Sequence, residues 1–211
     1  MTLICAGRKG IPREMIADLL WPETDGDRAH QNMNTTLHRL RRLLNQEDAV
    51  ENENGRLVLS MQYCWVDAWS FEALFDQAMH SRSLSEKEKL LKKSVALYTG
   101  PMEADAVAEI SLSYTERLKS KFARIIIELG SLLYENGKTE EALDLYRSAL
   151  EIEDSAENLY QALIGTLNIL GRATESIEMY RKCCMVLKTK YGTEPSPQTR
   201  ALYRKATASS G

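Results

Sequence analysis

The sequence predicts a mainly α-helical protein with two parts: two helices and a β-hairpin come first, and an all-α helical repeat follows. Three observations predict this fold. An arginine-rich segment carries an apolar stripe at helical spacing, a hairpin signal follows it, and the second half of the chain repeats with a period of 34 residues. We place the domain boundary after residue 66, which gives one domain over residues 1–66 and another over residues 67–205.

Residues 12–44 are predicted to form a short helix, a turn and a longer helix. The longer helix has an apolar stripe that must be buried, formed by Met33, Leu37, Leu40 and Leu44. Its opposite face is polar and carries Arg28, Gln31, Thr35, His38, Arg39 and Arg42. No Asp or Glu lies between Arg28 and Asn45, so the positive charge has no local neutralisation. Such side chains can read DNA bases or bind phosphates, and the alternative is a solvated amphipathic helix.

A β-hairpin is predicted directly after these helices. Asn54-Gly55 is a strong signal for a tight turn, and Leu57 and Leu59 alternate with other residues as in a half-buried strand. Two helices followed by a hairpin is the order of a winged helix. The hairpin region is acidic, which indicates that it is held off the phosphates or that Arg56 alone contacts them; the acidic residues are Glu47, Asp48, Glu51 and Glu53.

Four segments carry a family resemblance: IADLLWP at residues 16–22, HRLRRLL at 38–44, GRLVLS at 55–60 and VDAWSFEAL at 66–74. Together they resemble the OmpR-type winged helix of the SARP family of bacterial transcription activators. The resemblance implies that the longer helix enters the major groove of promoter DNA. It also implies base or groove contacts from Asn32, Thr35, Thr36, His38 and Arg39. The phosphate contacts that it implies come from Arg28, Arg41, Arg42 and Arg56.

The start of the chain departs from this family pattern. The family's module begins with a small antiparallel sheet and a complete first helix, whereas MTLICAGRKG resembles only the tail of that helix. We therefore expect a partial winged helix-turn-helix, with roughly the first third of the module missing and DNA affinity reduced accordingly. Whether a receiver domain or a complete winged-helix platform lies further upstream stays open.

The second half of the chain contains an internal repeat. Residues 123–156 align with residues 157–190, which pairs Leu129 with Leu163, Gly137 with Gly171, and Tyr146 with Tyr180. A 34-residue period with small and aromatic residues at these spacings is typical of tetratricopeptide-like helix pairs. We predict that the two tyrosines are equivalent and buried.

Helices are also predicted between the hairpin and the repeat. Phe71, Leu74, Phe75 and Ala78 form one apolar face, and a second helix with Leu90, Leu91, Val95 and Tyr98 is predicted to begin with a capping box at Ser85 and Glu88 and to end before Thr99-Gly100-Pro101. The region from Asp67 to about Tyr203, with LKTKYGTEPSPQTRALYR near its end, resembles the bacterial transcriptional activator domain that follows the winged helix in this family.

The first helix of each predicted pair would line a concave groove. By motif position the groove residues are Arg124, Ile127, Ser131, Tyr134, Asn158, Gln161 and Asn168. This mixture of polar and aromatic side chains suits a peptide or protein segment better than an apolar small molecule. Solvated polar residues without a partner are the alternative.

Composition excludes several other classes. The formal charge of −3 argues against a generally basic coat, and no apolar run is long enough to span a membrane, so we predict a cytoplasmic protein without a membrane partner. The cysteines lack a Cys-x-x-Cys pair, the histidines are scattered and no phosphate-binding loop occurs, so no metal, cofactor or catalytic site is predicted.

The predicted function is transcription regulation, with activation implied by the resemblance. The predicted partner of the first domain is double-stranded promoter DNA, and the helical repeat is predicted to contact a second copy of the chain, an effector or RNA polymerase. The alternative is a protein-interaction scaffold that does not bind DNA in this truncated form, and an enzyme is the least favoured class.

Overall fold

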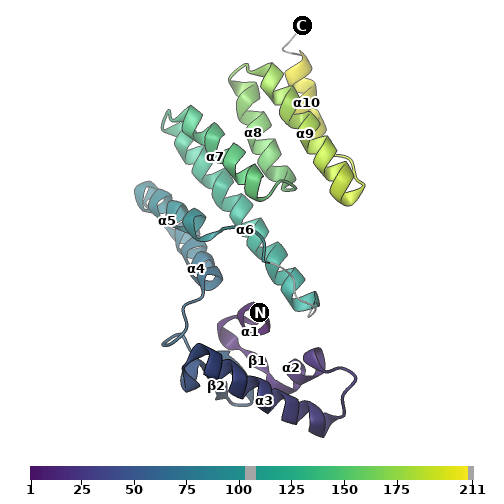
Figure 1. The fold of residues 1–211 in the computed structure, drawn as a ribbon. Helices are drawn as coiled ribbons and strands as arrows, with labels where there is room; N and C mark the ends of the chain where they lie inside the picture. The colour runs from purple at the N-terminus through teal and green to yellow at the C-terminus, as the bar shows by residue number, and fades with distance from the viewer. Residues whose placement is uncertain (103–107, 209–211) are drawn as a thin grey trace. The chain divides into compact units, whose positions relative to one another are not determined.

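The computed structural model describes residues 1–102 and 108–208. The chain divides into two compact units, one formed by Met1–Ser70 with Met102–Arg117 and the other by Phe71–Pro101 with Leu118–Gly211. The domain boundary after residue 66 stays a prediction. The fold is mainly α-helical with one small sheet, as the sequence predicted (Figure 1).

The first unit begins with short elements that lead into two helices and a hairpin. In chain order they are α1 (Thr2–Cys5), a 3₁₀ turn (Gly7–Lys9), β1 (Ile11–Pro12), α2 (Arg13–Leu20), α3 (Gly26–Leu44), a second 3₁₀ turn (Glu47–Ala49), β2 (Val50–Glu53) and β3 (Arg56–Leu59). The three strands form an antiparallel sheet in the order β1-β3-β2. The predicted hairpin is therefore confirmed, and β1 adds a strand that the sequence analysis did not predict.

Helix α3 supplies one wall of the core of this unit. Its apolar stripe packs Ala29, Met33 and Leu37 against Ile16 of α2 and Leu57 of β3, and all of these side chains are buried. Asn45 ends the helix in the left-handed conformation, with its N–H bonded to the Arg41 and Arg42 carbonyl oxygens. Leu40 is only half-buried and Leu44 is 45% exposed, so the predicted stripe is buried along its first part alone.

Gly10 allows β1 to approach β3 closely. Its φ is +62°, and a Cβ atom built on it would lie 2.3 Å from the Leu57 carbonyl oxygen. A side chain at this position would therefore collide with the backbone of the neighbouring strand as well as strain its own.

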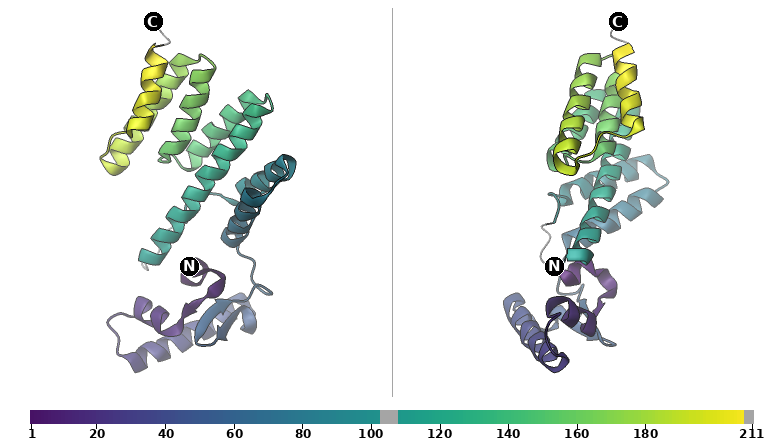
Figure 2. Two further views of the ribbon diagram at one scale, coloured as in Figure 1. Left: turned by 180° about the vertical axis from the view of Figure 1, so that it is seen from behind. Right: turned by 90° about the vertical axis from the view of Figure 1, so that its right-hand side faces the viewer.

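The second unit consists of helices. They are α4 (Asp67–His80), which begins in the first unit, α5 (Leu84–Leu97), α6 (Ala108–Glu135), of which the part from Leu118 belongs here, α7 (Thr139–Ile152), α8 (Glu157–Ile169), α9 (Ala173–Tyr191) and α10 (Pro197–Ala208). Helices α8, α9 and α10 pack against one another, and α7 packs against α8 (Figure 2).

The predicted helical repeat is confirmed by two helix pairs of the same design. Gly137 and Gly171 adopt φ values of 75° and 70° in the turns within the pairs. Gly130 of α6 lies against the ring of Tyr146 of α7, where a Cβ atom would be 2.3 Å from the tyrosine Cζ. The close crossing of α6 and α7 therefore leaves no room for a side chain at position 130 unless the Tyr146 ring moves. Tyr180 differs from the prediction, because it is only half-buried and stacks on Tyr203 of α10 with 4.3 Å between ring centroids.

An aromatic cluster holds α4, α5 and α6 together. Tyr98, just after α5, stacks on Phe122 with 4.2 Å between ring centroids and lies against Phe71 at 5.4 Å. Its hydroxyl donates a hydrogen bond to the buried carboxylate of Glu153. The predicted capping box at Ser85 was wrong: α5 begins earlier, and the Ser83 Oγ accepts the N-cap hydrogen bond from the Glu86 N–H.

Candidate nucleic-acid interface

The polar face of α3 is open to solvent. Arg28, Asn32, Thr35, Thr36, His38, Arg39 and Arg42 are all exposed. The Thr35 hydroxyl donates to the Gln31 carbonyl oxygen of the same helix at 3.0 Å, so its hydrogen-bond donor is occupied while the side chain stays exposed. Six of the nine residues predicted to contact DNA lie on or beside one outward face of one helix; Arg41, Arg56 and Thr36 are placed differently.

Three guanidinium groups on this face carry unneutralised positive charge. No described residue forms a salt bridge or side-chain hydrogen bond with Arg28, Arg39 or Arg42. The acidic residues nearest in sequence are Asp27 at the first turn and Glu47 beyond the helix end. The field of α3 therefore extends into solvent, where an anionic partner would meet it.

Arg41 and Arg56 have a different role from the other arginines. The Arg41 Nε and Nη2 donate to the Val50 carbonyl oxygen at 3.2 and 2.6 Å, which ties α3 to the start of β2. The Arg56 Nε donates to the Lys9 carbonyl oxygen at 2.9 Å and its Nη2 to the Gly10 carbonyl oxygen at 2.7 Å. The structure thus gives both guanidiniums bracing contacts, which their assignment to phosphates did not foresee.

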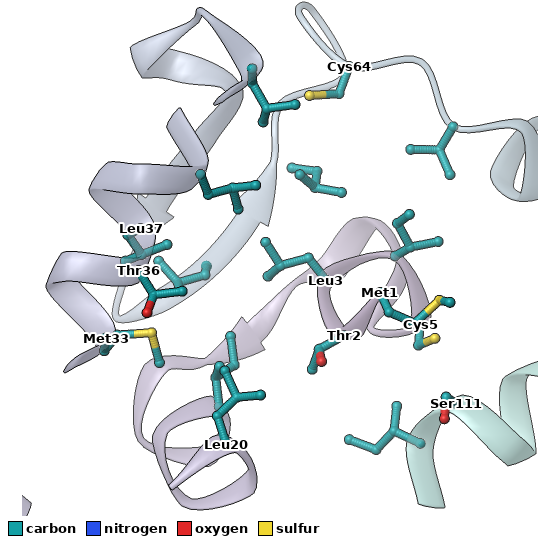
Figure 3. Close-up of a pocket in the computed structure, with 18 of the residues that line it drawn as sticks. Met1, Thr2, Leu3, Cys5, Leu20, Met33, Thr36, Leu37, Cys64 and Ser111 are labelled. Atoms are coloured by element: carbon teal, nitrogen blue, oxygen red, sulfur yellow. The ribbon is translucent and has the colours of Figure 1, made fainter. Parts of the chain in front are cut away.

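Thr36 lies on the flank of α3 that borders an apolar cavity. This cavity in the first unit has a volume of about 650 Å³, and Thr36 lines it together with Met33 and Leu37 (Figure 3). By helical periodicity Thr36 is closer to the buried stripe than to Arg42. Its predicted base contact therefore has less geometric support than that of Arg39.

Two residues beside this face were missed by the sequence analysis. Arg13, the first residue of α2, donates from Nη2 to the Asn34 Oδ1 of α3 at 2.7 Å. The Arg13 N–H also donates to the Gly55 carbonyl oxygen in the hairpin turn at 3.1 Å. The two residues are 21 positions apart, so no sequence spacing could have paired them.

The hairpin presents acidic residues on its β2 strand. Glu53 pairs with Arg56 and Glu51 with Val58 in the antiparallel register. Glu53 is exposed and Glu51 half-buried. The Arg56 guanidinium donates to two backbone carbonyl oxygens, so fewer of its N–H groups remain for a phosphate.

Of the seven residues predicted to line a groove, five are accessible and two bind another helix. Arg124, Ser131 and Asn158 are exposed, and Ile127 and Tyr134 are half-buried. The Arg124 guanidinium carbon lies 5.7 Å from the Phe75 ring centroid, within cation–π range. These five side chains are accessible on α6 and α8.

The predicted groove positions of Gln161 and Asn168 are corrected, because the amides of both residues bind α10. The Gln161 Nε2 donates to the Thr199 Oγ1 at 2.9 Å, and the Asn168 Nδ2 donates to the Leu202 carbonyl oxygen at 2.9 Å. They join α8 to the last helix and do not line an open groove. The segment PSPQT near the C-terminus explains this contact, since it starts the helix that covers them.

At the same junction, the carboxylate of Glu157 on α8 binds the residues at the start of α10. Glu157 accepts hydrogen bonds from the Ser196 N–H at 2.7 Å and from the Thr199 hydroxyl at 2.5 Å. Burial raises the pKa of Glu157, but the hydrogen bonds from Thr199 and Ser196 outweigh it and hold the pKa below its usual value. This half-buried carboxylate therefore anchors the start of the last helix.

Residues 1–102 and 108–208 contain no group of three His, Cys, Asp or Glu placed to hold a metal ion. Among the same residues, no helix has the length and apolar character needed to cross a membrane.

The chain thus joins a cationic, solvent-facing helix with an attached hairpin to a set of helical repeats. Residues 66–206 match the family described as the bacterial transcriptional activator domain. The chain belongs to this family.

Two known proteins resemble nearly the whole chain. It is 23% identical over 210 residues to the regulatory protein AfsR of Streptomyces griseus, a match that covers 96% of this chain and 21% of AfsR. Its fold is similar to that of Mycobacterium tuberculosis EmbR, solved in complex with a low-affinity phosphopeptide, with a TM-score of 0.68 and 17% identity over 98% of this chain and 57% of EmbR. The chain thus spans about a fifth of one relative and little more than half of the other.

Proposed function

We propose that this chain is the DNA-binding and partner-binding part of a transcription regulator, with the first unit acting as a partial winged helix. The observation that carries the proposal is the exposed face of α3, where Arg28, Arg39 and Arg42 have no acidic partner among the described residues. Opposite charges at i±3 and i±4 stabilise a surface helix, and a cationic helix without such pairs keeps its charge available for an anionic ligand. Double-stranded DNA supplies such a ligand with a groove wide enough for α3.

The bracing of the hairpin supports the same function. Arg41 ties β2 to α3, so the hairpin and the helix form one presenting surface. We propose that α3 makes the contacts in the major groove, and that the acidic hairpin stays away from the phosphates. In the phosphate role Arg28 and Arg42 are favoured over Arg41 and Arg56, because the latter two already bind carbonyl oxygens.

The first experiment measures binding of the full chain to labelled duplexes by fluorescence anisotropy over a range of salt concentrations. A random-sequence duplex and a duplex enriched by in vitro selection are the probes. We expect binding that weakens as salt rises, with the enriched duplex bound more tightly. Salt-independent or absent binding contradicts the proposal and favours the scaffold.

Two alanine variants separate base contact from phosphate contact. Arg39→Ala is expected to cost about 1–3 kcal/mol on the enriched duplex and to relax preference at one position. Arg42→Ala is expected to weaken all duplexes alike and to lower the salt slope by about one. Arg204→Ala is the matched control, since it removes the same charge from an exposed position on α10. Equal, sequence-independent losses for Arg39→Ala and Arg42→Ala would remove Arg39 from the specificity residues.

A second candidate function is partner binding by the helical repeat, with RNA polymerase or a second copy as the partner. The exposed Arg124, Ser131 and Asn158 on α6 and α8 favour it. The double variant Arg124→Glu with Asn158→Ala is expected to abolish activation in a reporter assay while the chain stays folded and its DNA affinity is unchanged; loss of the Arg124–Phe75 contact should lower the melting temperature only slightly. Lys182→Glu, at an exposed position of α9, is the charge-reversal control. Full activation by the double variant would exclude this surface.

A further inference from the structure

We propose that Arg13 fixes the base preference of Asn34, so that the pair reads a guanine in the major groove. This inference rests on the proposed DNA binding by α3 and extends it to two residues outside the predicted set. Its basis is the 2.7 Å hydrogen bond from the Arg13 Nη2 to the Asn34 Oδ1. Asn34 is exposed on α3, one turn from both Gln31 and His38.

The hydrogen bond determines which end of the Asn34 amide faces outward. A guanidinium has only N–H donors, so the amide atom that it binds must be the oxygen. The Asn34 Nδ2 group is then the part of the amide left for other contacts. Arg13 also retains N–H groups beyond the one that Asn34 accepts. The pair therefore offers several hydrogen-bond donors, while its one side-chain acceptor, the Asn34 Oδ1, has one of its two lone pairs in use.

The position of Arg13 is fixed by backbone contacts. Its N–H donates to the Gly55 carbonyl oxygen in the hairpin turn, and the preceding residues Ile11 and Pro12 pair with β3. Arg56 adds two hydrogen bonds to the carbonyl oxygens of Lys9 and Gly10. Arg13 therefore starts from a braced backbone, which keeps its side chain near Asn34.

A surface that presents mainly hydrogen-bond donors can distinguish guanine from adenine. An unengaged Asn can bind adenine bidentately, accepting from N6 and donating to N7. The Asn34 oxygen keeps a second lone pair, but the guanidinium bound to it brings further N–H donors beside it, and these would face the N6 amino donor of adenine unfavourably. Guanine presents two acceptors, O6 and N7, which match the donors of the pair. Arg13 thus converts a residue type that ordinarily favours adenine into one that favours guanine.

The test is in vitro selection from a random duplex library with the full chain, followed by anisotropy on the enriched duplex and its single-base variants. The parent is expected to prefer guanine at one position. Arg13→Ala frees the Asn34 oxygen, so the guanine-to-adenine ratio there is expected to fall roughly tenfold. Adding Asn34→Ala to Arg13→Ala is expected to remove that gain for adenine, because the freed amide is then absent. Arg8→Ala is the control, an exposed arginine of the same unit.

Two results would overturn the inference. If Arg13→Ala and Asn34→Ala weaken all duplexes alike, the pair contacts phosphate and does not read a base. If both variants keep the parent's preference at every position, the pair lies outside the interface. In each case the parent still binds DNA, so the proposed function survives; a parent that binds no duplex overturns both. Unchanged unfolding midpoints from tryptophan fluorescence would exclude loss of folding as the cause.

Discussion

Replacing Tyr146 by alanine is expected to lower the free energy of unfolding of the helical repeat by about 3–5 kcal/mol. Tyr146 is 3% exposed, and its ring fills the close crossing between α6 and α7. Burial raises the pKa of its hydroxyl, as expected for a side chain withdrawn from water. Alanine would leave a cavity that the backbone at Gly130 cannot fill.

Urea unfolding followed by circular dichroism measures this loss. The matched control is Tyr180→Ala, 34 residues later, where the ring is half-buried and stacks on Tyr203. We expect a smaller loss there, because part of that ring already contacts water. An unchanged midpoint for Tyr146→Ala would contradict the packing described for this crossing.

Gly10→Ala is expected to destabilise the first unit by about 3 kcal/mol. The substitution adds strain at φ +62° and places a Cβ atom 2.3 Å from the Leu57 carbonyl oxygen. The pairing of β1 with β3 would therefore have to open. Tryptophan fluorescence isolates this effect, because all three tryptophans of the chain, Trp21, Trp65 and Trp69, belong to the first unit.

Gly7→Ala separates the two causes of that destabilisation. Gly7 also has a positive φ, +70°, but a Cβ atom there would meet nothing within 4 Å. We expect it to cost about 1 kcal/mol, from backbone strain alone. Equal losses for the two glycine variants would mean that the strands move apart at little cost and that the collision is unimportant.

The sequence was sufficient for the elements whose residues contact one another locally. The stripe of Met33 and Leu37 predicted the buried side of α3, and Asn54-Gly55 predicted the turn of the hairpin. The 34-residue period predicted the helix pairs, because each pair repeats one local packing pattern. Mainly helical structure with a small sheet followed from these signals.

Contacts between distant segments could not be predicted in the same way. Strand β1 has two residues and exists only because Gly10 lets it lie against β3. Helix α10 covers Gln161 because Glu157 of α8 accepts a hydrogen bond from the Ser196 N–H just before α10, and these two residues are about 40 positions apart in the chain. The Arg13–Asn34 pair likewise joins side chains of two helices that lie 21 residues apart in the chain.

The carbonyl contacts of Arg41 and Arg56 have a consequence for the thermodynamics of association. Each guanidinium holds backbone that would otherwise be free to shift, at Val50 in one case and at Lys9 and Gly10 in the other. Helix α3, the β2–β3 hairpin and strand β1 are thereby preorganised, so a partner that contacts all three does not have to order them on binding. The conformational entropy lost on binding is then confined to long side chains such as Arg28, Arg39 and Arg42.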